Sequence, residues 1–120
     1  MRRFGNVPKQ PLCALFAFTS NYPALVRPKF LGKQLLRSAT SVAANYRASC
    51  RARSGGEYYA KLCICVEEAD ETQFWLDLLG QANIFPEARL AELRQEYGAI
   101  TAVLTTARHL AKSRKDSSEK

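Results

Sequence analysis

Acidic residues are almost absent from the first half of this chain. Residues 1–61 of the 120 contain eleven Lys and Arg residues but a single acid, Glu57. Residues 62–120 contain seven basic and ten acidic residues, so the net charge of +7 arises in the first half. A surface with one sign of charge differs from the mixed surface of an ordinary domain. It attracts anionic partners such as nucleic acid, an anionic membrane or an acidic protein.

Metal-binding and catalytic patterns are equally scarce. His109 is the one histidine, and the four cysteines, Cys13, Cys50, Cys63 and Cys65, lack the C-x-x-C spacing of zinc and redox sites. Helical residues two positions apart point about 200° away from each other, so Cys63 and Cys65 are not expected to chelate one ion. We therefore expect no enzyme activity, no metal and no cofactor, and we interpret the cysteines as small buried thiols in a reducing cytoplasm.

Long apolar runs are also missing. No segment approaches the roughly 20 apolar residues that a membrane-spanning helix needs. The segment Pro11–Phe18 follows basic residues and loosely resembles a signal peptide, but it is short and no A-x-A cleavage site follows it. The hydrophobic fraction of 47% and the length of 120 residues are those of one folded domain. We expect a cytoplasmic protein with no membrane partner and no small-molecule substrate.

Helical periodicity dominates residues 30–114. Apolar residues recur at steps of three and four in three segments, and no strand-like alternation is present. The first segment ends near Arg53, and the third begins at Pro86, a residue favoured in the first turn of a helix. The predicted apolar seams are Leu31, Leu35, Ala39, Val42 and Tyr46, then Leu62, Cys65, Ala69, Thr72, Leu76 and Leu79, then Leu90, Leu93, Tyr97, Ile100, Leu104, Ala107 and Ala111.

Short signals mark the ends of these helices. Ser54 and Glu57 have the spacing of a capping box. In this motif the Ser54 hydroxyl accepts the backbone N–H three residues on, and the Glu57 carboxylate reaches back to a backbone N–H at the start of the helix. Before residue 30, prolines leave room for at most one short helix, about Leu12–Ser20. The predicted organisation is an irregular N-terminal segment with a short first helix (1–29), three further helices of the same domain (30–114) and a disordered tail (115–120).

The basic residues of the first long segment fall on one helix face. On a helical wheel with 100° per residue, four of them lie within about 80° of arc, opposite the apolar seam. They form a stripe roughly 27 Å long that consists of Lys33, Arg37, Arg47 and Arg51. Such a stripe is either a solvated face or a phosphate-binding surface. The absence of acids before Glu57 favours the second interpretation. The candidate nucleic-acid contacts are Lys33, Arg37, Arg47, Arg51 and Arg53.

The second long segment carries the opposite charge in its middle. Glu67, Glu68, Asp70 and Glu71 lie too far from a helix N-terminus for the helix dipole to explain them. These four acids are candidates for helix pairing or oligomer contacts: they either pair with the basic segment or face a neighbouring subunit. Glu68 and Glu71 have the spacing of paired carboxylates, but the Glu-x-x-His pairs of di-iron bundles are absent.

Two parts of the sequence resemble a known bacterial family. Leu31–Arg47 followed by Cys50–Ser54, and Glu68–Thr72 followed by Trp75–Leu79, are similar to the 23S ribosomal RNA intervening-sequence protein family, also called the four helix bundle protein family. The resemblance covers about residues 31–114. It implies an all-α, antiparallel up-down four-helix bundle that assembles as a ring-like homopentamer, without catalysis. Some members are encoded inside insertions in ribosomal RNA genes, and related proteins are accessory proteins of diversity-generating retroelements.

The sequence departs from this family in two places. Members often have Gly where Ala39 and Ala43 stand here, and their first helix is long and amphipathic, unlike residues 1–28. Either the first helix is shortened, or this segment is a diverged or mis-assigned start. We expect a non-enzymatic bundle that associates with RNA through its basic helix face, with little sequence preference. The alternative is a homo-oligomeric interaction module in which the basic helix pairs with the acidic helix of a neighbour.

Overall fold

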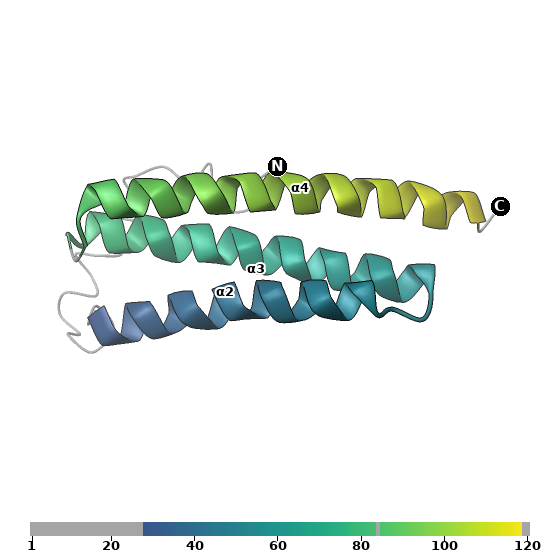
Figure 1. The fold of residues 1–120 in the computed structure, drawn as a ribbon, viewed down its shortest axis with the longest axis horizontal. Coiled ribbons are helices and arrows are strands. Elements are labelled where there is room, and N and C mark those ends of the chain that lie inside the picture. Colours follow the sequence, from purple (N-terminus) through teal and green to yellow (C-terminus); the bar gives the residue numbers. More distant parts are fainter. Residues whose placement is uncertain (1–27, 84, 119–120) are drawn as a thin grey trace.

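Three long α-helices form the fold. The computed structural model describes residues 28–83 and 85–118, and these contain helices and no strand. Helix α2 covers Pro28–Cys50, α3 covers Gly55–Gln81 and α4 covers Glu87–Ser118. The three helices run antiparallel in sequence order, and α3 packs against both of its neighbours (Figure 1). The predicted all-α class is thereby confirmed for these residues.

The helix boundaries differ in part from the predicted ones. Helix α2 begins at Pro28 instead of residue 30, because proline fits the first turn of a helix. It ends at Cys50, where the Arg51 N–H bonds to a carbonyl three residues earlier and tightens the last turn. Helix α4 continues past the predicted end, so Lys115–Ser118, expected to be disordered, are helical. The predicted first helix, Leu12–Ser20, lies outside the described residues.

The predicted Ser54 cap forms at the start of α3, but the Glu57 side chain reaches back to Arg53, one residue before the N–H of Ser54 that a standard capping box would use. The Ser54 hydroxyl accepts the N–H of Glu57 at 3.1 Å, and the Glu57 carboxylate accepts the N–H of Arg53 at 3.0 Å. Ser54 has the extended backbone of an N-cap residue, with φ −150° and ψ 162°. These two bonds fix the path of the turn between α2 and α3, and with it the direction in which the basic residues of that turn leave the bundle.

Two apolar clusters lie along α3, and each contains part of the apolar seam of this helix. Every residue of the seam predicted for this helix is buried, from Leu62 to Leu79. The α4 seam is less complete, because Leu93 and Ile100 stay partly exposed. The cluster nearer the α2–α3 turn contains Val42, Leu62, Cys65, Val66, Ala69, Leu104 and Ala111, and the other contains Leu31, Leu76, Leu78, Leu79 and Leu90.

Polar pairs join the helices between these clusters. The hydroxyls of Ser38 and Thr72, both fully buried, lie 2.8 Å apart across the α2–α3 interface. Gln73 donates to the Thr101 hydroxyl at 2.7 Å across the α3–α4 interface. The face of α2 that is buried against α3 includes the small Ser38 and Ser49, so it is rotated around the helix axis from the predicted apolar seam. Tyr46, predicted to lie in that seam, is consequently 53% exposed.

An apolar groove of about 470 Å³ separates α2 from α4. It exists because both helices pack on α3 rather than on each other. Val103 on one side and Tyr46 on the other are its most exposed large side chains, at 68% and 53%. The remaining lining residues are Ala39, Val42, Ala43, Tyr97, Ala99, Ile100 and Leu104.

Candidate nucleic-acid interface

The two ends of the molecule carry opposite charge. The α2–α3 turn and the C-terminal part of α4 lie at the same end (Figure 1). This end has eight Lys and Arg residues and two acids, Glu57 and Asp116. The opposite end, formed by residues 28–37, 67–81 and 87–97, has five basic and eight acidic residues. We call the first set the cationic end; its basic residues are Arg47, Arg51, Arg53, Lys61, Arg108, Lys112, Arg114 and Lys115.

The predicted basic stripe is divided between these two ends. Lys33 and Arg37 lie in the first half of α2, next to the acidic part of α3. The Arg37 guanidinium forms ion pairs with Glu68, at 3.4 Å, and with Glu71. The positive charge of Arg37 is therefore offset by carboxylates of its own chain, and less of it is available to an outside polyanion.

The other two residues of the predicted stripe, Arg47 and Arg51, and the further candidate Arg53 have free guanidinium groups. Arg47, Arg51 and Arg53 are exposed, and none of them forms an ion pair with another residue of the described helices and turns. Arg51 and Arg53 follow the end of α2, so they lie in the turn and not on the predicted helix face. Whether these residues contact nucleic acid remains a prediction, but their charges are accessible.

Sequence reasoning alone missed five of the eight basic residues of the cationic end, namely Lys61 of α3 and four residues of α4. Arg108, Lys112, Arg114 and Lys115 belong to the last turns of α4, a region whose final residues were expected to be disordered. The signal was present, because residues 108–115 contain four basic residues and no acid. An antiparallel arrangement of three helices places the end of the third beside the turn between the first two. The topology thus joins two basic segments that are distant in the sequence.

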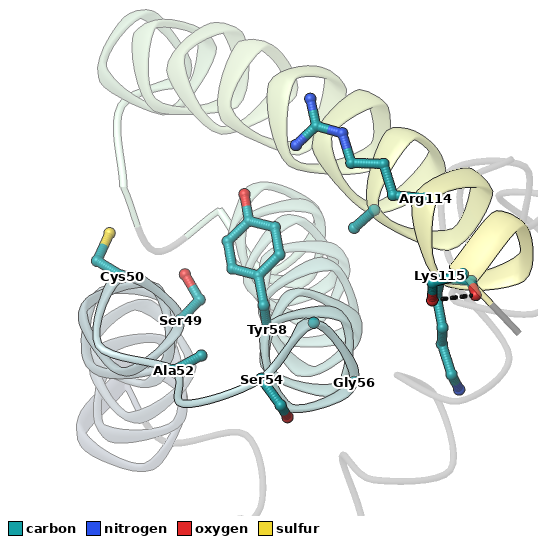
Figure 2. A pocket seen from close by; sticks show the side chains of 11 residues that line it. Ser49, Cys50, Ala52, Ser54, Gly56, Tyr58, Arg114 and Lys115 are labelled. Atoms are coloured by element: carbon teal, nitrogen blue, oxygen red, sulfur yellow. Dashed lines mark hydrogen bonds between the residues drawn. The ribbon is translucent and has the colours of Figure 1, made fainter.

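A cleft of about 740 Å³ opens at the cationic end, between the last turns of α2 and α4 and the first turn of α3. Tyr58 stands between Cys50 of α2 and Arg114 of α4 (Figure 2). Lys115 is directed elsewhere, with its Nζ 5.5 Å from the centre of the Tyr59 ring. The other lining residues are Ser49, Ala52, Ser54, Gly55, Gly56, Ala111 and Ser118, and none of the described lining residues is acidic.

The four predicted pairing acids differ in their surroundings. Glu68 and Glu71 are partly buried against Arg37 of the same chain. Asp70 is buried, with 4% of its surface exposed, whereas Glu67 is exposed. One of the two predicted uses of these acids, pairing with the basic helix, is therefore realised within the chain by Glu68 and Glu71. A contact with a neighbouring subunit remains a prediction.

The cysteines and the histidine do not come together. Cys65 is buried with its sulfur 3.7 Å from the Val42 carbonyl, and burial raises the pKa of its thiol. The expectation of buried thiols is wrong for Cys50, which is exposed at the end of α2 and lines the cleft. Its hydrogen bond raises the pKa of the Tyr46 hydroxyl. Across residues 28–83 and 85–118 no group of three or more His, Cys, Asp or Glu side chains is placed to hold a metal ion. His109 is exposed on α4.

None of the helices within the described part of the chain is long and apolar enough to cross a lipid bilayer. The cationic end carries guanidinium and ammonium groups that form no ion pair with a described residue, and two of them, Arg114 and Lys115, belong to residues that line the cleft. Such groups bind phosphate and carboxylate oxygens, as point charges from Lys and as bidentate forks from Arg.

Comparisons with known proteins agree on one family. The family model described as 23S rRNA-intervening sequence protein matches residues 13–106. A 1.70 Å crystal structure of a protein of unknown function from the S23 ribosomal protein family of Bacteroides thetaiotaomicron VPI-5482 is similar, with 28% sequence identity and a TM-score of 0.66. The match covers 82% of this chain and 88% of that one. No curated protein matches the chain. Since the family model spans most of the sequence, this chain belongs to the 23S rRNA-intervening sequence protein family.

Proposed function

We propose that this protein is a non-enzymatic helical-bundle protein of the bacterial cytoplasm that binds RNA through its cationic end. One observation carries the proposal: eight basic residues from two separate segments meet there with two acids. Contacts from such groups go to the phosphate backbone and carry no sequence information. We therefore expect low sequence preference and an affinity that falls steeply with salt, because each neutralised phosphate releases counterions.

Arg51 and Arg53 offer the sharpest test of this proposal. Both lie in the turn, are exposed and form no ion pair with any described side chain, so their replacement should leave the fold unchanged. The experiment measures fluorescence anisotropy of a labelled RNA at salt concentrations from 50 to 300 mM. For the double variant R51Q/R53Q we expect at least a tenfold weaker affinity at low salt. The slope of log K against log salt should fall by about 1.4 to 1.8, at roughly 0.7 to 0.9 per phosphate contact.

A matched control removes the same charge from the opposite end. Lys29 and Arg89 are exposed and lie at the starts of α2 and α4. K29Q/R89Q has the same net charge as R51Q/R53Q, so a general electrostatic effect would weaken both variants equally. Equal losses, or no binding by the unaltered protein at 50 mM salt, would contradict the proposal.

The apolar groove favours a second candidate function, a homo-oligomeric assembly module. Val103 and Tyr46 expose apolar surface along it, and apolar patches of this kind commonly mark interaction sites. The resemblance suggests a pentamer, and a short first helix at Leu12–Ser20 would complete a four-helix bundle by covering part of the groove. Multi-angle light scattering on the protein and on V103D tests this candidate. A lower mass for V103D supports assembly through the groove. A monomeric unaltered protein rules that assembly out.

A further inference from the structure

The cleft at the cationic end has the dimensions of a small-ligand site. Its volume of about 740 Å³ lies within the range of roughly 300–1,000 Å³ that encloses small ligands in proteins. A paired RNA helix keeps its bases stacked inside and offers only its backbone and groove edges. If RNA enters this cleft, the part that enters is therefore an unpaired nucleotide.

The walls of the cleft carry one side chain suited to the base of a nucleotide and one suited to its phosphate. Tyr58 supplies an aromatic ring, and no other described residue hydrogen-bonds to its hydroxyl. Arg114, on the α4 side, is exposed and has no ion-pair partner among the described residues. Figure 2 shows both side chains on the same cleft, with Arg114 across from Tyr58. An aromatic ring stacks on any base, and a guanidinium binds phosphate, so the pair matches a nucleotide without selecting its identity.

Two glycines of the first turn of α3, Gly55 and Gly56, line the cleft. Neither Gly55 nor Gly56 has a positive φ, so the backbone does not require glycine there. A Cβ added at Gly55 would meet nothing within 4 Å, so packing does not require it either. Glycine weakens a helix relative to alanine. The wall of the cleft at position 55 therefore has room for a side chain that glycine does not supply.

We propose that this cleft holds one unpaired nucleotide of the bound RNA, with its base against Tyr58 and its phosphate at Arg114. The proposal rests on the RNA binding proposed above and adds a preference for single-stranded RNA over duplex RNA. The remaining basic residues of the cationic end then follow the backbone on either side of that nucleotide.

The test compares two probes, a single-stranded 20-nucleotide RNA and a fully paired RNA duplex of the same length. For the unaltered protein we expect tighter binding of the single strand. In Y58L this preference should disappear, with a loss of roughly 5- to 100-fold for the single strand, the range measured for base–aromatic stacking, and little change for the duplex. Y58F should keep the preference, because phenylalanine retains the ring. R114Q should weaken single-strand binding and lower its salt dependence by about one phosphate contact.

The matched control is Y59L. Tyr59 is the next residue, is likewise half-buried and packs against the same apolar cluster, but it does not line the cleft. Y58L and Y59L should therefore lose similar stability, while only Y58L loses the preference for single strands. If both lose it equally, or if Y58L binds both probes as the unaltered protein does, the cleft holds no base.

G55L gives an answer even if Y58L fails to fold. The added side chain enters open space and replaces glycine with a stronger helix former, so the fold should persist. Because Gly55 lines the cleft, we expect the leucine side chain to occupy part of the cleft volume, and single-strand binding should fall toward the duplex value. An unchanged preference in folded G55L would overturn the proposal. The proposed function fails separately, since in that case the unaltered protein binds neither probe, whereas equal binding of both probes removes only the cleft inference.

Discussion

Two of the three arginines at the acidic end form ion pairs, whereas none of the arginines at the cationic end pairs with a described residue. At the acidic end, Arg37 contacts two carboxylates of α3, and Arg94 contacts one on α3 and one on its own helix. At the cationic end, Arg47, Arg51 and Arg114 have no such partner among the described residues. A paired charge helps to hold the helices in register, whereas an unpaired charge remains available to an outside partner. Formal charge along a sequence therefore identifies a binding surface only after the neighbouring acids are located in space.

The largest expected effect tests whether the two ends form one cooperative unit. Leu62 and Leu76 are fully buried in different apolar clusters along α3. L62A and L76A should each lower the free energy of unfolding by about 2–5 kcal/mol, because each leaves a cavity in a packed interior. Urea unfolding followed by circular dichroism measures this loss. Two separate transitions, or a loss below about 1 kcal/mol in either variant, would mean that one end is not packed as described.

The cap at the cationic end should have the next largest effect. Ser54 accepts the Glu57 N–H, and its replacement leaves that donor without its protein partner. S54A should lower the free energy of unfolding by about 1 kcal/mol, within a range of 0.5–2. Thermal melts detect this loss. S113A is a suitable control, since its hydroxyl bonds to a carbonyl within α4 on an exposed turn, and a loss equal to that of S54A would argue against the special role of the cap.

A pair of single substitutions sharpens the comparison between the ends. Arg37→Gln removes two ion pairs of a half-exposed side chain and should cost no more than about 1 kcal/mol of stability, with little change in RNA affinity. Arg51→Gln should leave stability unchanged and weaken RNA binding several-fold at low salt. Chemical unfolding and anisotropy on the same two preparations give both quantities. The reverse pattern would place the binding surface at the acidic end.

The smallest expected effect is a loss of stability at alkaline pH. Burial raises the pKa of the Cys65 thiol above its usual 9.0 and that of the Tyr97 hydroxyl above its usual 10.0. The folded state therefore holds these protons more tightly than the unfolded state. Their contribution to stability is complete below about pH 9 and is lost as the pH rises through the folded pKa values. Melting temperatures from pH 7 to 11 should show the decline. Y97F should reduce it, and an identical decline in Y97F would remove Tyr97 as a cause.

The sequence was sufficient to predict the features that depend on neighbours along the chain. The buried seam of α3 from Leu62 to Leu79 follows from helical periodicity, and the bond from the Glu57 N–H to the Ser54 hydroxyl follows from spacing. The exposure of Tyr46 did not follow, because it depends on how closely the small Ser38 lets α2 approach α3.

The candidate site was predicted only in part for the same reason. The helix wheel placed Arg51 on a continuous face, but α2 ends one residue earlier. The wheel also gave Arg37 the same weight as Arg47, because a single helix contains no information about the carboxylates of the next one. The α4 contribution to the cationic end, such as Arg114, required the antiparallel topology, which brings together residues more than 50 positions apart.

The position of the cleft at the tip of an elongated molecule has a geometric consequence. The chain measures 54 Å along its longest axis and about 26 Å across. A site at the tip leaves the long sides of the rod free for lateral association. Copies standing side by side in the same orientation would present their tips on one common surface. Several weak sites held on one surface bind a flexible polymer with an effective concentration that no single tip provides.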